Sequence, residues 1–219
     1  GFGSLSQKTA AGAVSEYEHC RPSTMYGCNK LYCEHLGRYY AHSYRQLAKD
    51  SVAGKDKNRG VVDFRCVRYP GLISADTIPT GGTSDFVPEM LHAAARGEQY
   101  KCFVRPDSRI PFMTMPEAIE ATLKLADTER KDLTQIVYNI ASFNPSAGEV
   151  ADLVKVHFPN ADITFAPDER RQAIVDSWPS ALDCSVAQRD WGFKPTYTLE
   201  QAFEQYLVPR ITKQHESSV

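Results

Sequence analysis

The sequence of 219 residues has no apolar run that approaches the ~20 residues a membrane-spanning helix needs. It also has no block of like charge, and 25 basic against 27 acidic side chains give a net charge of −2. Nucleic-acid binding relies on a basic surface that neutralises phosphates, so this balance argues against it. We therefore expect neither a membrane protein nor a nucleic-acid-binding protein.

Spacings typical of metal sites and disulfide frameworks are missing as well. The six cysteines form no CxxC pair and the six histidines no HExxH motif, so we expect no metal site. No segment has the apolar pattern of a secretory signal, which predicts reduced thiols in the cytoplasm or, in a eukaryotic cell, the mitochondrial matrix. We expect the cysteines to be small buried hydrophobic side chains.

A glycine-rich phosphate-binding loop is the third feature that the sequence lacks. Of its 13 glycines only Gly1 and Gly3 stand in a GxG arrangement, and no strand precedes them. A dinucleotide pyrophosphate is usually held by such a loop at a helix N-terminus. Because the sequence also begins with Gly1 instead of Met, we expect it to be a fragment that alone binds a dinucleotide poorly.

What is present is an alternation of helical and strand-like segments. Helical spacing, caps and prolines predict helices over residues 25–45, 86–96, 116–127, 146–157 and 181–191. Residues with high β propensity predict strands over residues 61–69, 99–104, 109–115, 137–140 and 163–165. Residues 46–60 are predicted to form a charged surface loop, and the end from Thr212 a frayed tail. This alternation is typical of an α/β chain with a largely parallel sheet, here followed after about residue 75 by a mixed α+β extension.

Tyr26 and Lys30 are the first candidates for chemistry. They stand four residues apart in the predicted long helix, so both side chains lie on one side, one turn apart. A lysine ammonium next to a phenol favours the phenolate, which can act as a general base toward an alcohol. The next predicted strand ends at Pro70-Gly71, and ligands bind at the carboxyl ends of strands in open α/β sheets.

Longer motifs connect these features to a known family. The segments are Thr24 to Lys30, Arg68 to Ser74, Gly81 to Phe86, Val137 to Ile140 and Arg171 to Pro179. In this order they resemble the extended short-chain dehydrogenase/reductases of the NAD-dependent epimerase/dehydratase superfamily. Within these enzymes the sequence is similar to the short-chain type of L-threonine 3-dehydrogenase over nearly its whole length.

The resemblance implies an α/β fold: the C-terminal part of a Rossmann-type doubly wound sheet and a small α+β substrate-binding subdomain. Residues 1–75 would belong to the NAD-binding domain and residues 76–210 mainly to the substrate-binding subdomain, with returns to the sheet near 110–140. Residues 211–219 would form a tail. The glycine-rich loop, the ribose-binding acid and the catalytic Ser or Thr of the family would precede Gly1.

The resemblance also implies an oxidoreductase that uses NAD+ to oxidise L-threonine to 2-amino-3-oxobutyrate, without a metal. Tyr26 would be the base, and Lys30 would activate it and hold the nicotinamide ribose. The residues implied to bind NAD are Tyr26, Lys30, Pro70, Gly71, Leu72 and Ile73. The residues implied to bind substrate are Ser74, Gly82, Thr83, Ser84, Asp85 and Trp178. A Gly-Gly-Thr-Ser-Asp run is also typical of an ordinary helix N-cap, and a Trp before Pro of ordinary packing.

Two alternative functions stay open. One is a nucleotide-sugar epimerase or dehydratase of the same superfamily, which needs cationic groups for a diphosphate where residues 82–85 offer hydroxyls and an acid. The other is a truncated, non-catalytic dimerisation module. The helix over residues 25–45 carries apolar side chains such as Leu36 and Tyr39 away from the Tyr26 side. The family uses this helix in a two-fold contact, so we expect a homodimer.

Overall fold

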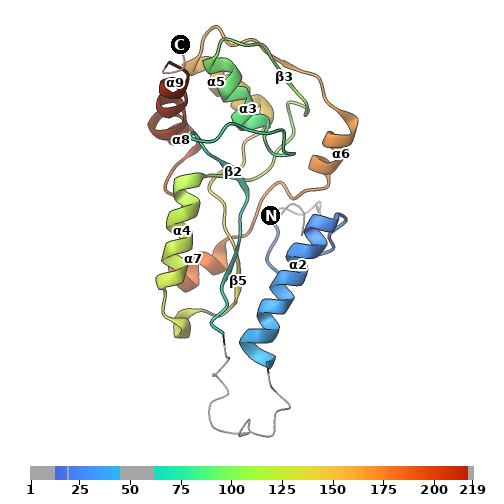
Figure 1. Cartoon of the computed structure of the whole chain (residues 1–219), viewed down its shortest axis with the longest axis vertical. Coiled ribbons are helices and arrows are strands. Elements are labelled where there is room, and N and C mark those ends of the chain that lie inside the picture. The colour runs from blue at the N-terminus through green and yellow to red at the C-terminus, as the bar shows by residue number, and fades with distance from the viewer. Residues whose placement is uncertain (1–12, 19, 45–61, 217–219) are drawn as a thin grey trace, which may run out of the picture.

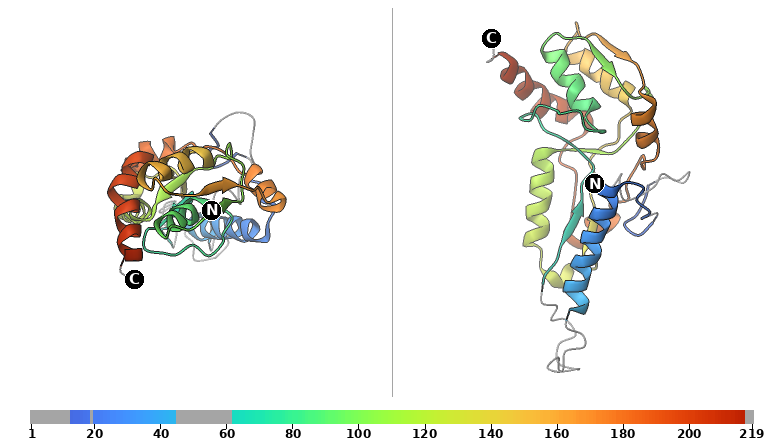
Figure 2. Two further views of the ribbon diagram at one scale, coloured as in Figure 1. Left: turned by 90° about the horizontal axis from the view of Figure 1, so that it is seen from above. Right: turned by 45° about the vertical axis from the view of Figure 1, so that its right-hand side comes forward.

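The computed structural model describes residues 13–18, 20–44 and 62–216. Figure 1 shows an elongated molecule with a lower half around α2, α4 and α7 and an upper half around α3, α5, α6 and α9. The right-hand view of Figure 2 shows the same two halves, one above the other. Three pairs of short parallel strands run through it: β1 (Cys66–Arg68) with β5 (Val137–Asn139), β2 (Gly71–Ile73) with β4 (Phe112–Thr114), and β3 (Tyr100–Cys102) with β6 (Ile163–Phe165). The α/β class with parallel pairing is therefore confirmed.

Helices cover the strands in both halves. The lower helices are α2 (Met25–Arg38), continued by a π-helical turn over Tyr39–Ser43, α4 (Met115–Asp127) and α7 (Ser185–Trp191). The upper helices are α3 (Phe86–Ala95), α5 (Ala147–His157), α6 (Glu169–Asp176), α8 (Leu199–Ala202) and α9 (Val208–Glu216). A π-helical turn over Phe203–Leu207 joins α8 to α9, and a 3-10 turn over Arg130–Asp132 follows α4.

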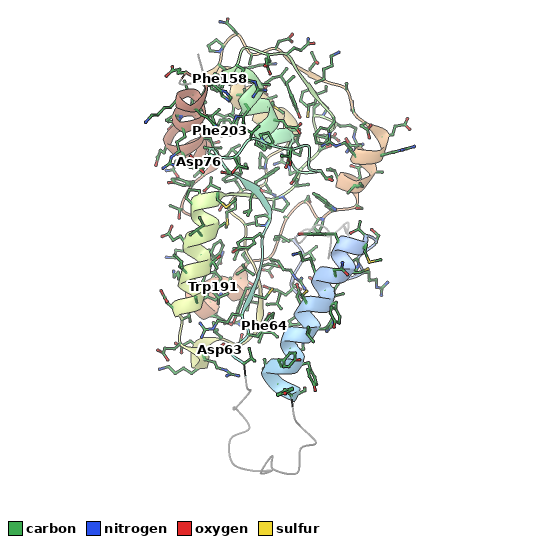
Figure 3. All side chains as sticks on the ribbon, in the orientation of Figure 1. Asp63, Phe64, Asp76, Phe158, Trp191 and Phe203 are labelled. Atoms are coloured by element: carbon green, nitrogen blue, oxygen red, sulfur yellow. The ribbon has the colours of Figure 1, made fainter. Side chains whose placement is uncertain are left out.

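Each half has its own hydrophobic core. The upper core gathers side chains of α3, α5, β4 and the C-terminal helices, among them the fully buried Phe86, Phe112 and Phe203. The lower core joins α4, β5 and α7 through residues such as Tyr138 and Trp191, whose rings lie 6.0 Å apart. Figure 3 shows Phe203 in the upper half and Trp191 in the lower half. Strands β1 and β2 follow one another, so the backbone of 66–73 passes from the lower half to the upper.

Helix starts follow the sequence signals. The Thr24 hydroxyl accepts from the Gly27 amide at 3.1 Å and caps α2. Ser146 and Glu149 form a capping box at α5, which reciprocally satisfies two backbone amides. At α4 the Glu117 carboxylate accepts from the Thr114 amide, next to a proline in the first turn. The predicted starts of these three helices are thus confirmed within about one residue.

Several predicted elements need correction. The strand predicted over 61–69 is reduced to Cys66–Arg68, and its first residue lies outside the described part of the chain, as does the loop predicted over 46–60. The helix predicted from residue 181 begins at Ser185. Helix α6 was not predicted as a helix at all. The frayed tail from Thr212 is wrong up to Glu216, because α9 continues that far with Ile211 fully buried, while residues 217–219 lie outside the described part.

The expectation of six buried cysteines is also wrong. Cys102 is buried, whereas Cys28 and Cys33 are exposed on α2 and the other three are half-buried. Within the ranges that the structure describes, no helix is long and apolar enough to cross a membrane.

Candidate active site

Tyr26 and Lys30 lie together on the first turns of α2. The Lys30 Nζ atom lies 5.2 Å from the centroid of the Tyr26 ring, over its face. Tyr26 keeps 53% of its surface exposed, and Lys30 is exposed as well. The predicted proximity of the two side chains is therefore confirmed. Both side chains are accessible to a ligand.

Farther along the same side of α2, a buried ion pair and a close contact fix the helix against its neighbours. Glu34 accepts two hydrogen bonds from Arg68 of β1, both 2.8 Å long. Burial disfavours the charge of Arg68, but the hydrogen bonds to Glu34 outweigh it and raise the pKa of the guanidinium. A Cβ atom at Gly37 would lie 2.3 Å from the Phe64 ring, which Figure 3 shows beside α2. These contacts set the rotation of α2 and hence the side on which Tyr26 stands.

Arg68 also ties the N-terminal segment to this region. Its Nη1 donates to the carbonyl oxygen of Glu16 at 2.9 Å, and the Glu16 carboxylate accepts from the amide of Asn139 in β5 at 2.9 Å. Glu16 is 2% exposed, and burial raises the pKa of its carboxyl. Sequence reasoning missed this buried network, because the partners are separated by 34 to 123 positions.

Strand β2 holds three of the four residues predicted to line the nicotinamide, and Pro70 directly precedes it. Pro70, Gly71 and Ile73 are buried and Leu72 is half-buried. The Gly71 amide donates to the carbonyl oxygen of Pro111 at 3.0 Å, and a Cβ atom at this glycine would lie 2.6 Å from the Phe112 ring. The structure therefore explains Gly71 by close packing, and contact of these residues with a cofactor stays a prediction.

The predicted substrate segment forms a tight turn before α3. The Gly82 amide donates to Asp85 Oδ2 at 2.7 Å, and the Asp85 amide donates to the Gly82 carbonyl oxygen at 3.1 Å. Asp85 occupies the N-cap position, but its side chain makes no capping bond to α3 and instead points back to Gly82. Thr83 and Ser84 are half-buried. The ordinary N-cap interpretation thus holds for the backbone of Asp85 and not for its carboxylate.

The remaining predicted residues, Ser74 and Trp178, lie on other segments of the chain. The Ser74 hydroxyl accepts from the Asp76 amide at 3.2 Å just after β2. Trp178 follows α6, is half-buried and packs against the upper core. The predicted substrate residues thus lie on three segments: the end of β2, the turn before α3 and the end of α6.

Arg171 of α6 is a contact residue that sequence reasoning did not assign. Its Nη2 donates to the carbonyl oxygens of Gly82 at 2.8 Å and Gly81 at 3.3 Å. The guanidinium carbon lies 3.1 Å from the centroid of the Phe103 ring. The available signal was Asp168, which caps α6 by accepting from the Arg171 amide at 2.9 Å and could have predicted the helix.

A cavity of the described part of the chain lies away from these residues. It has a volume of about 440 Å³ and is lined by side chains near the C-terminal end of α2 and after α4, including Arg38, His42 and Lys131. It contains none of the predicted site residues. In the described ranges no group of three or more His, Cys, Asp or Glu residues could hold a metal ion. Burial raises the pKa of the Cys66 thiol to about 11 and that of Cys184 to about 12, which disfavours both as nucleophiles.

Comparison with known proteins identifies relatives of this chain. The model of the NAD dependent epimerase/dehydratase family matches residues 2–141. The mitochondrial L-threonine 3-dehydrogenase of Bos taurus is 36% identical over 181 residues, which are 83% of this chain and 44% of the bovine protein. The chain thus spans less than half the length of that curated relative.

Solved structures show the same relationship in three dimensions. The GalE-like L-threonine dehydrogenase of Cupriavidus necator is 34% identical, with a TM-score of 0.82 over 97% of this chain and 69% of that one. A monomeric L-threonine 3-dehydrogenase from a metagenome database is 29% identical, with a TM-score of 0.83 over 97% of this chain and 63% of that one. Both share its Rossmann-like α/β fold. The chain belongs to the NAD-dependent epimerase/dehydratase family.

Proposed function

We propose that this chain supplies the catalytic Tyr/Lys pair and the substrate-binding residues of an NAD-dependent enzyme that oxidises L-threonine to 2-amino-3-oxobutyrate. The observation that carries the proposal is the Lys30 ammonium over the accessible Tyr26 ring at the start of α2. The names of the bovine and Cupriavidus necator relatives support the choice of substrate.

Tyr26 acts as the general base in this proposal. Oxidation of a secondary alcohol removes the hydroxyl proton and a hydride from the carbinol carbon. The Tyr26 oxygen takes the proton of the threonine hydroxyl, and the adjacent Lys30 ammonium stabilises the phenolate that does so. Bound NAD+ supplies the acceptor for the hydride, so that the carbinol carbon becomes the ketone carbon of the product.

The turn before α3 is suited to a small zwitterion. Asp85 uses Oδ2 for the Gly82 amide, and among the described residues Oδ1 has no hydrogen-bond partner. A carboxylate oxygen in this situation can pair with the substrate ammonium. Thr83 and Ser84 offer hydroxyl groups, and Trp178 offers an apolar wall for a small pocket.

The described residues fit one end of NAD better than the other. Tyr26 and Lys30 are exposed side by side, where they can hold the hydroxyls of the nicotinamide ribose. For the pyrophosphate the sequence has no G-x-G-x-x-G run. NAD binding through Tyr26, Lys30 and the end of β2 is therefore part of the proposal, and a pyrophosphate site is not.

The test compares two tyrosines on one helix. Activity is measured on the longest natural polypeptide that carries these 219 residues. Tyr26→Phe should lower kcat by about 10²–10⁴, the usual contribution of a general base, with little effect on the affinity for NAD+. Tyr32→Phe, at a tyrosine of α2 that is 64% exposed, is the matched control and should leave kcat unchanged.

Substrate choice is tested on the same protein. L-Threonine and UDP-sugars are supplied in parallel, and NADH formation and sugar epimerisation are both followed. Turnover of a UDP-sugar without turnover of threonine would support the epimerase alternative and end our proposal. Near-normal activity of Tyr26→Phe would remove the assigned base while leaving the substrate open.

A further inference from the structure

Helix α6 is anchored to a loop of the upper half by side chains on one of its faces. Gln172 is 5% exposed, and its Oε1 accepts from the Arg105 amide at 2.7 Å. The Gln172 Nε2 donates to Ser108 Oγ at 2.9 Å and to Asp176 Oδ1 at 2.8 Å. Arg105 also forms two hydrogen bonds with the Asp176 carboxylate, at 2.8 and 3.0 Å. The helix is therefore fixed to the 105–108 loop at its middle and at its C-terminal end.

Arg171 reaches from this fixed helix to the turn before α3. Its guanidinium lies over the Phe103 ring and donates to the two adjacent carbonyl oxygens of Gly81 and Gly82. Stacking on an aromatic ring restricts a guanidinium without using its N–H donors, so they stay available for the carbonyls. Figures 1 and 2 show α6 apart from the other upper helices, above the N-terminal end of α2.

The turn needs an external support of this kind. Gly81 has φ of +91°, and two consecutive glycines give the backbone more conformational freedom than any other pair of residues. A Cβ atom at Gly81 would contact nothing within 4 Å, so this side of the turn is not held by packing. Carbonyl contacts from Arg171 are therefore well placed to select one conformation of the turn.

We propose that Arg171 is a positioning residue for the substrate turn: by holding the carbonyls of Gly81 and Gly82 it keeps Thr83 and Asp85 oriented toward the bound substrate. The inference rests on the proposed function where it concerns substrate. The same helix ends at Asp176, and the Trp178 amide donates to the Val175 carbonyl oxygen at 3.0 Å. Helix α6 thereby sets the position of the turn and of Trp178 relative to each other.

The first experiment measures the turn directly in the 219-residue chain, without any ligand. Arg171→Met keeps an unbranched aliphatic side chain over Phe103 and removes the N–H donors to the carbonyl oxygens. Arg171→Lys keeps the positive charge but lacks the planar guanidinium group. Amide hydrogen exchange of Gly82 and Asp85 should become about tenfold faster in Arg171→Met and be intermediate in Arg171→Lys. Arg170→Met, at the exposed neighbouring arginine, should leave both amides as they are.

Urea unfolding separates a local from a global effect. Arg171→Met could lower the free energy of unfolding so far that amide exchange rises throughout the chain. In that case the exchange rates of Gly82 and Asp85 in Arg171→Lys are compared with those in Arg170→Met, and faster exchange in Arg171→Lys supports the proposal. Unchanged exchange of Gly82 and Asp85 in Arg171→Lys and Arg171→Met would overturn the proposal. Faster exchange confined to residues 81–85 would support it.

The second experiment tests the consequence for substrate on the longest natural polypeptide. Arg171→Met should raise the KM for L-threonine about tenfold, with the KM for NAD+ unchanged and kcat changed by less than about threefold. An equal rise in both KM values, or none, would contradict a role confined to the substrate turn. If the unmodified protein oxidises no threonine, the proposed function fails, and the exchange experiment still decides whether Arg171 holds the turn.

Discussion

Asp85 has two carboxylate oxygens and uses one of them within its own turn. Oδ2 accepts from the Gly82 amide at 2.7 Å, which stabilises the turn, and the proposed function assigns Oδ1 to the substrate ammonium. An amide oxygen can accept the same hydrogen bond as a carboxylate oxygen but carries no charge. Asparagine at this position therefore separates the role in the turn from the role toward substrate.

We expect Asp85→Asn to raise the KM for L-threonine by about 10- to 100-fold, because a charge-assisted contact becomes a neutral one. The thermal midpoint should change little, since the contact with the Gly82 amide is kept. Asp76→Asn, at an exposed aspartate paired with Arg210 at 3.2 Å, is the matched control. An unchanged KM for threonine in Asp85→Asn would contradict an ammonium contact at this carboxylate.

Residue-scale prediction from the sequence succeeded where partners are close along the chain. Tyr26 and Lys30 are one helical turn apart, so their neighbourhood follows from helix geometry alone. Gly82 and Asp85, which are joined by a hydrogen bond, are also only three residues apart. The orientation of the Asp85 carboxylate toward Gly82 and not toward α3 depends on the local backbone. Arg171 and Gly82 are 89 residues apart, and only the tertiary structure brings them together.

At the scale of elements, α3 and α9 meet through two histidines. His92 Nδ1 lies 2.9 Å from His215 Nε2, and His92 is 1% exposed. Burial, His215 and Arg96 together lower the pKa of His92 to about 4, and the backbone of Thr77 opposes this slightly. Glu98, which faces His215, is already paired with Arg96. The packing of α9 therefore requires His92 to be neutral.

This pair makes the stability of the chain depend on pH. The unfolded chain binds a proton at His92 near its ordinary pKa of 6.5, whereas the folded chain does so only near about 4. The unfolded state thus binds more protons, and the free energy of unfolding falls as pH decreases from about 6.5 to about 4, by at most about 3 kcal/mol. Urea unfolding at about pH 7.0, 5.5 and 4.5, the first value above this range and the other two within it, should show the loss.

Variants assign the loss to His92. His92→Gln should reduce the dependence on pH over this range, even if it lowers stability at pH 7. His35→Gln, at an exposed histidine on α2, should keep the dependence of the unmodified chain. If the free energy of unfolding of His92→Gln depends on pH as steeply as that of the unmodified chain, groups other than His92 cause the dependence.

Predictions of elements were most reliable where caps and periodicity agree. Pro116 and Ser146 marked the starts of α4 and α5, and both helices end at the predicted residues Asp127 and His157. The strand before Pro70 was predicted too long, because high β propensity does not guarantee a pairing partner and only Cys66–Arg68 finds one in β5. The C-terminal α9 escaped prediction because its sequence is polar and its stability comes from burying Ile211 against α3 and the upper core.

At the scale of the whole molecule, α2 and its π-helical extension expose a large apolar surface. Met25 is 76% exposed, Tyr32 64%, Tyr39 45% and Leu36 39%. Tyr39 also contacts Tyr40, with ring centroids 5.4 Å apart. Apolar surface gathered on one helix is typical of a docking site, and a second copy of the same helix would cover it with an isologous contact.

We therefore predict a homodimer through α2. Light scattering at tens of micromolar protein should give twice the mass of the chain. The Tyr32→Glu variant should have the mass of the monomer. Val156→Glu, at a valine of α5 that is 71% exposed, should leave the dimer intact. A monomeric mass for the unmodified protein would contradict the prediction and match the relative named as monomeric.

NAD binding by the 219 residues alone is the last prediction, and it concerns what the chain as a whole offers. Tyr26 and Lys30 can contact the nicotinamide ribose, but the 13 glycines include no G-x-G-x-x-G run for the pyrophosphate. We expect calorimetry to show weak binding of NAD+, with a Kd of about 1 mM or above, because no glycine-rich loop of these residues contacts the pyrophosphate. Lys30→Met should abolish the residual binding, and Lys124→Met, at a lysine of α4, should not. A Kd of about 1 μM or below would mean that these residues hold the pyrophosphate by groups other than a glycine-rich loop.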